Sequence, residues 1–125
     1  MHIAEIEREA RQLEENLQLF DNQIYELEEF MKNLDFIAKS KEKEALSTIG
    51  KRVYLKTKIE DSSKLFVDIG AGVVLQKTPE ETLRIVREQI SGLQGARKQL
   101  ASQLEMYYKE LEDFINQKVP EFSAD

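Results

Sequence analysis

Residues 53–77 read VYLKTKIEDSSKLFVDIGAGVVLQK, and apolar and polar side chains alternate along two runs of this stretch. Alternation with a period of two residues is typical of β-strands. Gly, Ser and acidic residues interrupt the runs where turns are needed. Together with the residues just before it, the stretch predicts two successive β-hairpins built from four strands, near 46–49, 52–59, 64–69 and 73–77.

Four short strands from about thirty residues leave open edges and half-exposed apolar faces. Proteins normally close such strands into a barrel or pair them with another chain. We therefore expect this region to drive oligomeric assembly. The apolar strand residues that we expect at the subunit interfaces are Val53, Leu55, Ile59, Leu65, Val67, Ile69, Val73 and Leu75.

The sequence before the strands has a different period, with apolar residues at alternating steps of three and four. A 3.5-residue period held for about five heptads predicts a helix in a left-handed coiled coil. No position of this seam is polar. Its residues are Ile3, Ile6, Ala10, Leu13, Leu17, Phe20, Ile24, Leu27, Met31, Leu34 and Ala38.

A second helix is expected to start at Thr78, which can cap it, with Pro79 at the first helical position and Glu81 three residues after the cap. Its seam has the same alternating steps, and Pro120 ends the pattern. The seam residues are Leu83, Val86, Ile90, Leu93, Arg97, Leu100, Leu104, Tyr107, Leu111 and Phe114.

Arg97 is the polar position in this second seam, and Gly92 and Gly95 lie close to it. Each glycine costs about 1 kcal/mol relative to alanine in a helix, so we expect the helix to be locally weak or closely packed there. The two helices, about 3–43 and 79–118, are similar in length and should lie antiparallel, because neither can bury its stripe alone.

These elements predict an α+β fold: a long antiparallel coiled-coil hairpin of two helices, joined by two β-hairpins that assemble into an oligomeric β-barrel. We expect a single domain over residues 1–125. Its parts are a helix in 1–45, the β-hairpins in 46–77, a helix in 78–119 and a tail in 120–125.

Composition argues against catalysis, cofactors and metals. The chain has no cysteine and one histidine, at position 2, so thiolate sites and a histidine base are absent. The net charge of −6 argues against nucleic acid as a partner. The apolar runs are too short to span a membrane, and we expect a cytoplasmic protein that is not an enzyme.

Residues 59–82 read IEDSSKLFVDIGAGVVLQKTPEET and resemble the alpha-class subunits of prefoldin. The specific part of the resemblance is Val-Asp-Ile-Gly-Ala-Gly at 67–72, followed by an apolar strand and Lys77-Thr78 at the start of the helix. Two hairpins rather than one also match the alpha class. The specific motif covers about a quarter of the chain, and the heptads extend the resemblance over the rest.

The resemblance implies an ATP-independent chaperone, a holdase. Two alpha and four beta subunits would assemble through a double β-barrel, from which six coiled-coil arms extend. The arm tips would hold unfolded client proteins and deliver them to a group II chaperonin. Consistent with this, residues 70–72 lack the spacing and the following Lys-Ser/Thr of a phosphate-binding loop.

A client-binding surface needs apolar side chains that folded proteins keep covered. At the arm tips, the seam ends could splay and expose such side chains. Ile6 and Leu111 could equally complete the coiled-coil seam, and Phe122 could lie in a disordered tail. The candidate client-binding residues are Ile3, Ile6, Ala10, Leu111, Phe114, Ile115, Val119 and Phe122.

Two other functions remain open from the sequence. The same architecture could form a homo-oligomeric or filamentous scaffold with the arms as spacers. A coiled-coil hairpin could also bind RNA, but this would need a basic stripe that the arms lack.

Overall fold

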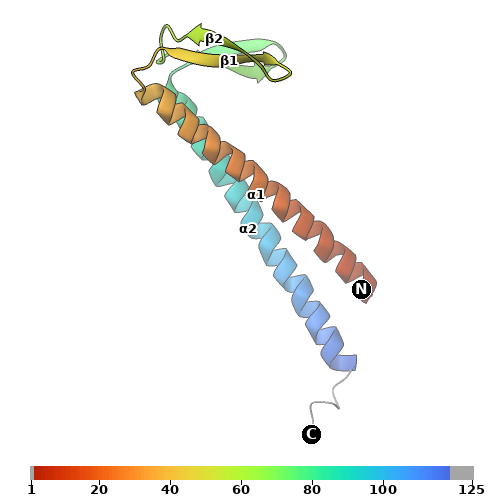
Figure 1. Ribbon diagram of the computed structural model, residues 1–125. Coiled ribbons are helices and arrows are strands. Elements are labelled where there is room, and N and C mark those ends of the chain that lie inside the picture. Colours follow the sequence, from red (N-terminus) through yellow and green to blue (C-terminus); the bar gives the residue numbers. More distant parts are fainter. Residues whose placement is uncertain (1, 119–125) are drawn as a thin grey trace. The chain divides into compact units, whose positions relative to one another are not determined.

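The computed structural model describes residues 2–118 and consists of two long helices joined by two antiparallel β-hairpins (Figure 1). This is the predicted fold class, and the oligomeric β-barrel stays a prediction. The helices are α1 (Ile3–Lys39) and α2 (Pro79–Lys118). The strands are β1 (Glu44–Gly50), β2 (Val53–Lys58), β3 (Leu65–Gly70) and β4 (Val73–Lys77).

The chain divides into two compact units. One contains the chain up to Glu26 and from Gln89 on, and the other contains Leu27–Glu88. The first unit holds the parts of α1 and α2 near the termini, and the second holds the remaining parts of both helices with the hairpins. Within each unit the two helical segments run antiparallel (Figure 1).

The predicted seams form the buried surface of both units. In the first unit Ile6, Ala10, Leu13 and Ile24 are buried, and in the second Leu34 and Val86 are. The other seam residues are half-buried, apart from Ala38, which is exposed. Buried side chains thus follow the 3.5-residue period, as a coiled-coil seam requires.

Helix α1 ends at Lys39, four residues before the predicted end at Lys43. The Ser40 amide makes the last helical bond, to the Phe36 carbonyl (2.9 Å). The Lys43 carbonyl instead accepts a hydrogen bond from the Ile59 amide, next to the first pair of the hairpin. The sequence prediction missed this because charged residues 41–44 give no seam signal against which to place the end.

Helix α2 begins as predicted. The Thr78 hydroxyl accepts a hydrogen bond from the Glu81 amide at 3.1 Å, which satisfies one of the amides left open at a helix N-terminus. The Thr82 hydroxyl donates to the Thr78 carbonyl (2.9 Å), and Thr82 is buried. Close packing at Gly92 and Gly95 is not present, because an added Cβ would have no atom within 4 Å beyond the adjacent residues and the backbone of its own helix.

The two hairpins form separate two-stranded sheets, β1–β2 and β3–β4. Both have a register shift just before a two-residue turn, between Thr48 and Gly50 in the first and between Asp68 and Gly70 in the second. The turn residues have positive φ angles: 50° and 64° at Lys51 and Arg52, and 52° and 76° at Ala71 and Gly72. Such angles at consecutive positions are those of type I′ turns, which match the twist of a hairpin.

The link between the hairpins is held by Asp61. The Ser63 hydroxyl (2.5 Å) and the Ser63 amide (2.9 Å) both donate to the Asp61 carboxylate. Both hydrogen bonds lower the pKa of Asp61, and the bond from the hydroxyl has the larger effect. The acidic turn predicted between strands is therefore a local side-chain-to-backbone turn.

Leu34 and Leu19 provide a matched test of the seam. Leu34 is 3% exposed and Leu19 is 59% exposed, and both lie on α1. Leu34→Ala should lower the free energy of unfolding by about 2–5 kcal/mol because it leaves a cavity. Leu19→Ala should change it by less than about 0.5 kcal/mol. Urea unfolding followed by circular dichroism measures both, and equal losses would contradict the seam.

Candidate assembly and client-binding surfaces

Most of the apolar hairpin residues predicted for assembly are exposed in the isolated chain. Among the eight predicted residues, Ile59, Leu65 and Val67 are half-buried. The other five are exposed in the isolated chain: Val53 51%, Leu55 53%, Ile69 58%, Val73 47% and Leu75 40%. They lie on all strands except β1 and are available to another chain.

The opposite faces of the hairpins also carry exposed apolar side chains, beside polar ones such as Lys56 and Asp68, and the sequence analysis did not select them. Tyr54 and Phe66 are 59% and 71% exposed, and Val74 is 55% exposed. Side chains on a strand alternate between its faces, so Tyr54 and Val74 lie opposite to Val53 and Val73. The signal was present in the unbroken apolar run of β4, since a strand buried on both faces has no alternation.

Strand β1 adds two exposed residues that the sequence analysis did not select, Leu46 (71%) and Ile49 (63%). Leu46 pairs with Lys56, and that lysine also forms an ion pair with Glu44 (3.4 Å) on the same strand as Leu46. Two-stranded ribbons are marginally stable alone in water. The described hairpins therefore have both open strand edges and exposed apolar side chains. Together these form a surface suited to pairing with other chains.

The candidate client residues at the helix ends differ in exposure. Ile6 and Ala10 are 3% and 4% exposed, so both belong to the buried seam in this structure. Ile3, Leu111 and Phe114 are half-buried. The coiled-coil seam thus continues to the ends of the described helices, because small Ala10 and the larger seam residues still find cover.

Ile115 is the clearly exposed apolar residue at this end, with 52% of its surface open. It lies next to the seam residue Phe114, outside the seam itself. Val119 and Phe122 lie outside the described residues. Only part of the predicted client surface is therefore visible as exposed apolar side chain.

Arg97 interrupts the α2 seam and pairs with Asp21 of α1 within the first unit. Arg97 Nε donates to Asp21 Oδ1 (2.5 Å), and a terminal guanidinium nitrogen lies 3.4 Å from Oδ2. This hydrogen bond and the carboxylate charge raise the pKa of Arg97. Sequence analysis identified Arg97 but missed Asp21, because a flanking acid looks like any other solvated residue until the register between the helices is known.

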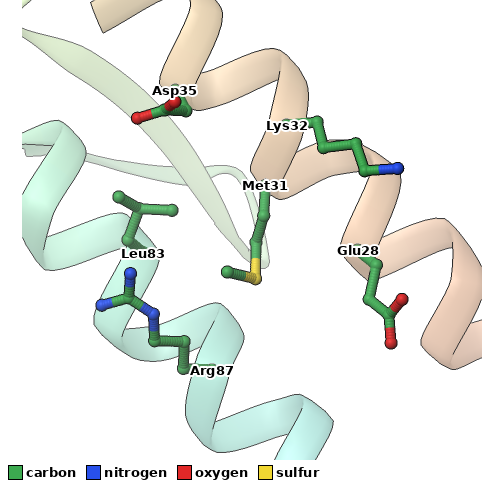
Figure 2. A pocket seen from close by; sticks show the side chains of 6 residues that line it. All are labelled: Glu28, Met31, Lys32, Asp35, Leu83 and Arg87. Carbon is green, nitrogen blue, oxygen red and sulfur yellow. The ribbon is translucent and has the colours of Figure 1, made fainter.

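A groove of about 460 Å³ lies between α1 and α2 in the second unit (Figure 2). Met31 and Leu83 form its apolar part, and Met31 points from α1 toward α2 (Figure 2). Asp35 and Arg87 add opposite charges, and Glu28 and Lys32 complete the lining.

No group of three or more His, Cys, Asp or Glu side chains within residues 2–118 is placed to hold a metal ion. No helix in the described part of the chain is long and apolar enough to cross a membrane.

The Prefoldin subunit family profile matches residues 6–119. The chain belongs to the prefoldin family. This match covers both helices and both hairpins, so the resemblance noted at residues 59–82 extends over nearly the whole sequence. Family membership makes the chain a prefoldin-type chaperone subunit and gives no support to an enzymatic role.

Two prefoldin alpha subunits are similar in sequence. Prefoldin subunit alpha of Archaeoglobus fulgidus is 28% identical over 101 residues, which is 74% of each chain. Prefoldin subunit alpha of Methanoregula boonei is 24% identical over 104 residues, covering 83% of this chain and 68% of the relative.

A solved structure has the same fold. The cryo-EM structure of filamentous PFD from Methanocaldococcus jannaschii gives a TM-score of 0.79 at 22% identity, covering 92% of this chain and 96% of that one. The two long helices and the paired hairpins are therefore the architecture of a known prefoldin-type protein.

Exchanging the charges of Asp21 and Arg97 tests the ion pair. Asp21→Arg places two guanidinium groups together and Arg97→Asp two carboxylates, so each single variant should lower the melting temperature. The double variant should recover most of the loss, because it restores the opposite charges. Differential scanning calorimetry at low and high salt measures this, and the recovery should shrink with added salt. Additive losses in the double variant would show that the pair does not interact.

Proposed function

We propose that this chain is an alpha-class subunit of an ATP-independent holdase, which binds unfolded polypeptides and passes them to a group II chaperonin. The observation that carries the proposal is the uncovered apolar surface of the two hairpins in a chain of the prefoldin family. The two similar proteins from Archaeoglobus fulgidus and Methanoregula boonei are prefoldin alpha subunits. We propose a cytoplasmic assembly of two such chains with four beta-class subunits.

In this proposal the hairpins are the assembly elements. Open strand edges bond to strands of neighbouring subunits, and the exposed apolar side chains on one face of each ribbon become the interior of a β-barrel, because alternate side chains of a barrel strand point outward. In the second hairpin, Ile69 on β3 and Val73 on β4 lie on either side of the turn. In the first hairpin, Val53 and Leu55 lie on β2. Burying this surface between chains supplies the stability that the separate ribbons lack.

The helix ends would bind clients. Ile115 supplies exposed apolar surface, and the half-buried Leu111 and Phe114 border it on α2. Ile6 and Ala10 would join this surface only when the two helix ends separate, and Ile3, Val119 and Phe122 extend the proposed region. Apolar side chains at a helix end can contact many different unfolded sequences, because hydrophobic burial is non-directional.

A second candidate is a homo-oligomeric or filamentous scaffold. The specific observation in its favour is the similar fold of a protein described as filamentous. Both candidates use the hairpins for assembly, and they differ in the partner. Native mass spectrometry of the chain alone and with a beta-class subunit separates them: a discrete hetero-hexamer supports the first candidate, and a growing homopolymer supports the second.

Removing the helix ends tests the client site. A chain lacking residues 1–10 and 112–125 should assemble with the same number of subunits, because the hairpins remain, and should lose suppression of aggregation. Light scattering of a guanidine-unfolded model enzyme measures this. Leu19→Ser is the control, since it changes an exposed apolar residue away from the helix ends. If the truncated assembly suppressed aggregation as well as the full-length one, the client site would not lie at the helix ends.

A single charge in the hairpin tests assembly. Ile69→Asp changes a residue that is 58% exposed in the isolated chain, so the chain itself should fold. In the assembly the same position would be covered, and a buried unpaired carboxylate should dissociate it. Tyr25→Asp, at a helix position that is 63% exposed, is the matched control. An unchanged elution volume for Ile69→Asp would contradict the proposed interface, as would Val67→Asp with the same result.

A further inference from the structure

The turns of the two hairpins are built in the same way. In each, a side-chain oxygen two residues upstream accepts a hydrogen bond from a glycine amide: Thr48 from Gly50 at 3.1 Å, and Asp68 from Gly70 at 2.8 Å. Gly50 and Gly70 have φ angles of 110° and 105°, and two residues with positive φ follow each of them. The second hairpin is therefore an internal reference for the first.

The two turns differ at their second position. Gly72 has a φ of 76° in the β3–β4 turn, and the equivalent residue of the β1–β2 turn is Arg52, with a φ of 64°. Lys51 precedes it, also with positive φ. Left-handed backbone is unfavourable for residues with a Cβ, and Asn-Gly or Asp-Gly usually fill both positions of this turn. The first hairpin thus holds two long basic residues where glycine-containing pairs fit best, and backbone preference does not account for them.

The basic turn stands out electrostatically. Lys51 and Arg52 are both exposed, and neither is a partner in the ion pairs described above or in those of Lys32, Lys39 and Lys64 with nearby carboxylates. With Lys56 and Lys58 against Glu44, the hairpin over residues 44–58 has a net charge of +3 in a chain of net charge −6. The rest of the chain therefore carries −9, and α1 alone carries ten acidic against four basic side chains.

We propose that the Lys51–Arg52 turn is an electrostatic docking contact for carboxylates on a second copy of this chain. This inference rests on the proposed function, in which the hairpins join subunits. A hairpin that pairs with a neighbour carries its turn onto that neighbour, and Lys51 and Arg52 form the closed end of β1–β2. The β1–β2 hairpin of a second copy is itself positive, and its negative charge lies elsewhere, with ten acidic side chains on α1. The carboxylates that the turn would contact are therefore those of α1 in the second copy. The same −9 would repel a nucleic acid backbone, which disfavours that occupant.

The test uses Lys51→Asn with Arg52→Gly, which installs the Asn-Gly pair preferred in this turn. The hairpin should be retained and the melting temperature should stay the same or rise. Self-association of the full chain, measured by sedimentation equilibrium at about 50 mM salt, should nevertheless weaken about tenfold. Its salt dependence should also be flatter than that of the wild type. Lys41→Gln with Lys43→Gln is the control, because it removes two positive charges from the α1–β1 connection and should leave self-association unchanged.

Equal self-association of the turn variant and the wild type, or no self-association of the wild type at low salt, would overturn the inference. A short fluorescent single-stranded RNA tests the other occupant: binding to it that depends on the turn, without turn-dependent self-association, would also overturn it. Failure of the proposed assembly is recognised separately, because Ile69→Asp would then associate as well as the wild type.

Discussion

The apolar surface of the two hairpins is the constraint on which the rest of the structure depends. Each hairpin is a two-stranded ribbon with free edges, and both of its faces carry exposed apolar side chains, such as Val53 and Tyr54 on β2 and Val73 and Val74 on β4. Residues 2–118 do not cover this surface, so burying it requires contact with other segments or other chains. The helices do not provide that cover, because their apolar stripes are used in packing α1 against α2. Assembly is thus a consequence of how the apolar residues are divided between two kinds of element.

Much of this division could be predicted from the sequence, because period is a local property. The seam from Ile3 to Leu34 and the Thr78 cap were predicted from spacing alone, and the structure has both. The two hairpins followed from the change to a two-residue period. Their bounds shifted by up to two residues, since paired backbone extends into Glu44 and Gly70, where side-chain pattern gives no signal.

The features that the sequence did not reveal depend on tertiary register or on backbone angles. Asp21 became the partner of Arg97 only once α1 and α2 were aligned. Spacing left open whether Ile6 completes the seam or lies at an open helix end, and in the structure the seam covers both Ile6 and Ala10. The positive φ of Arg52 could not be read from a Lys-Arg pair, because such pairs are common in helices and ordinary strands. In each case the missing information was either the position of a second segment or the backbone φ angle of the residue itself.

The central claim is that hairpin surface left open in the single chain is covered by other subunits. Hydrogen–deuterium exchange, compared between the assembled protein and the Ile69→Asp chain, measures that cover amide by amide. The account predicts strong additional protection in the assembly at the strand amides that face outward from each ribbon, with little change along the middle of α1 and α2. Equal exchange at the β1–β4 amides in the two samples would contradict it.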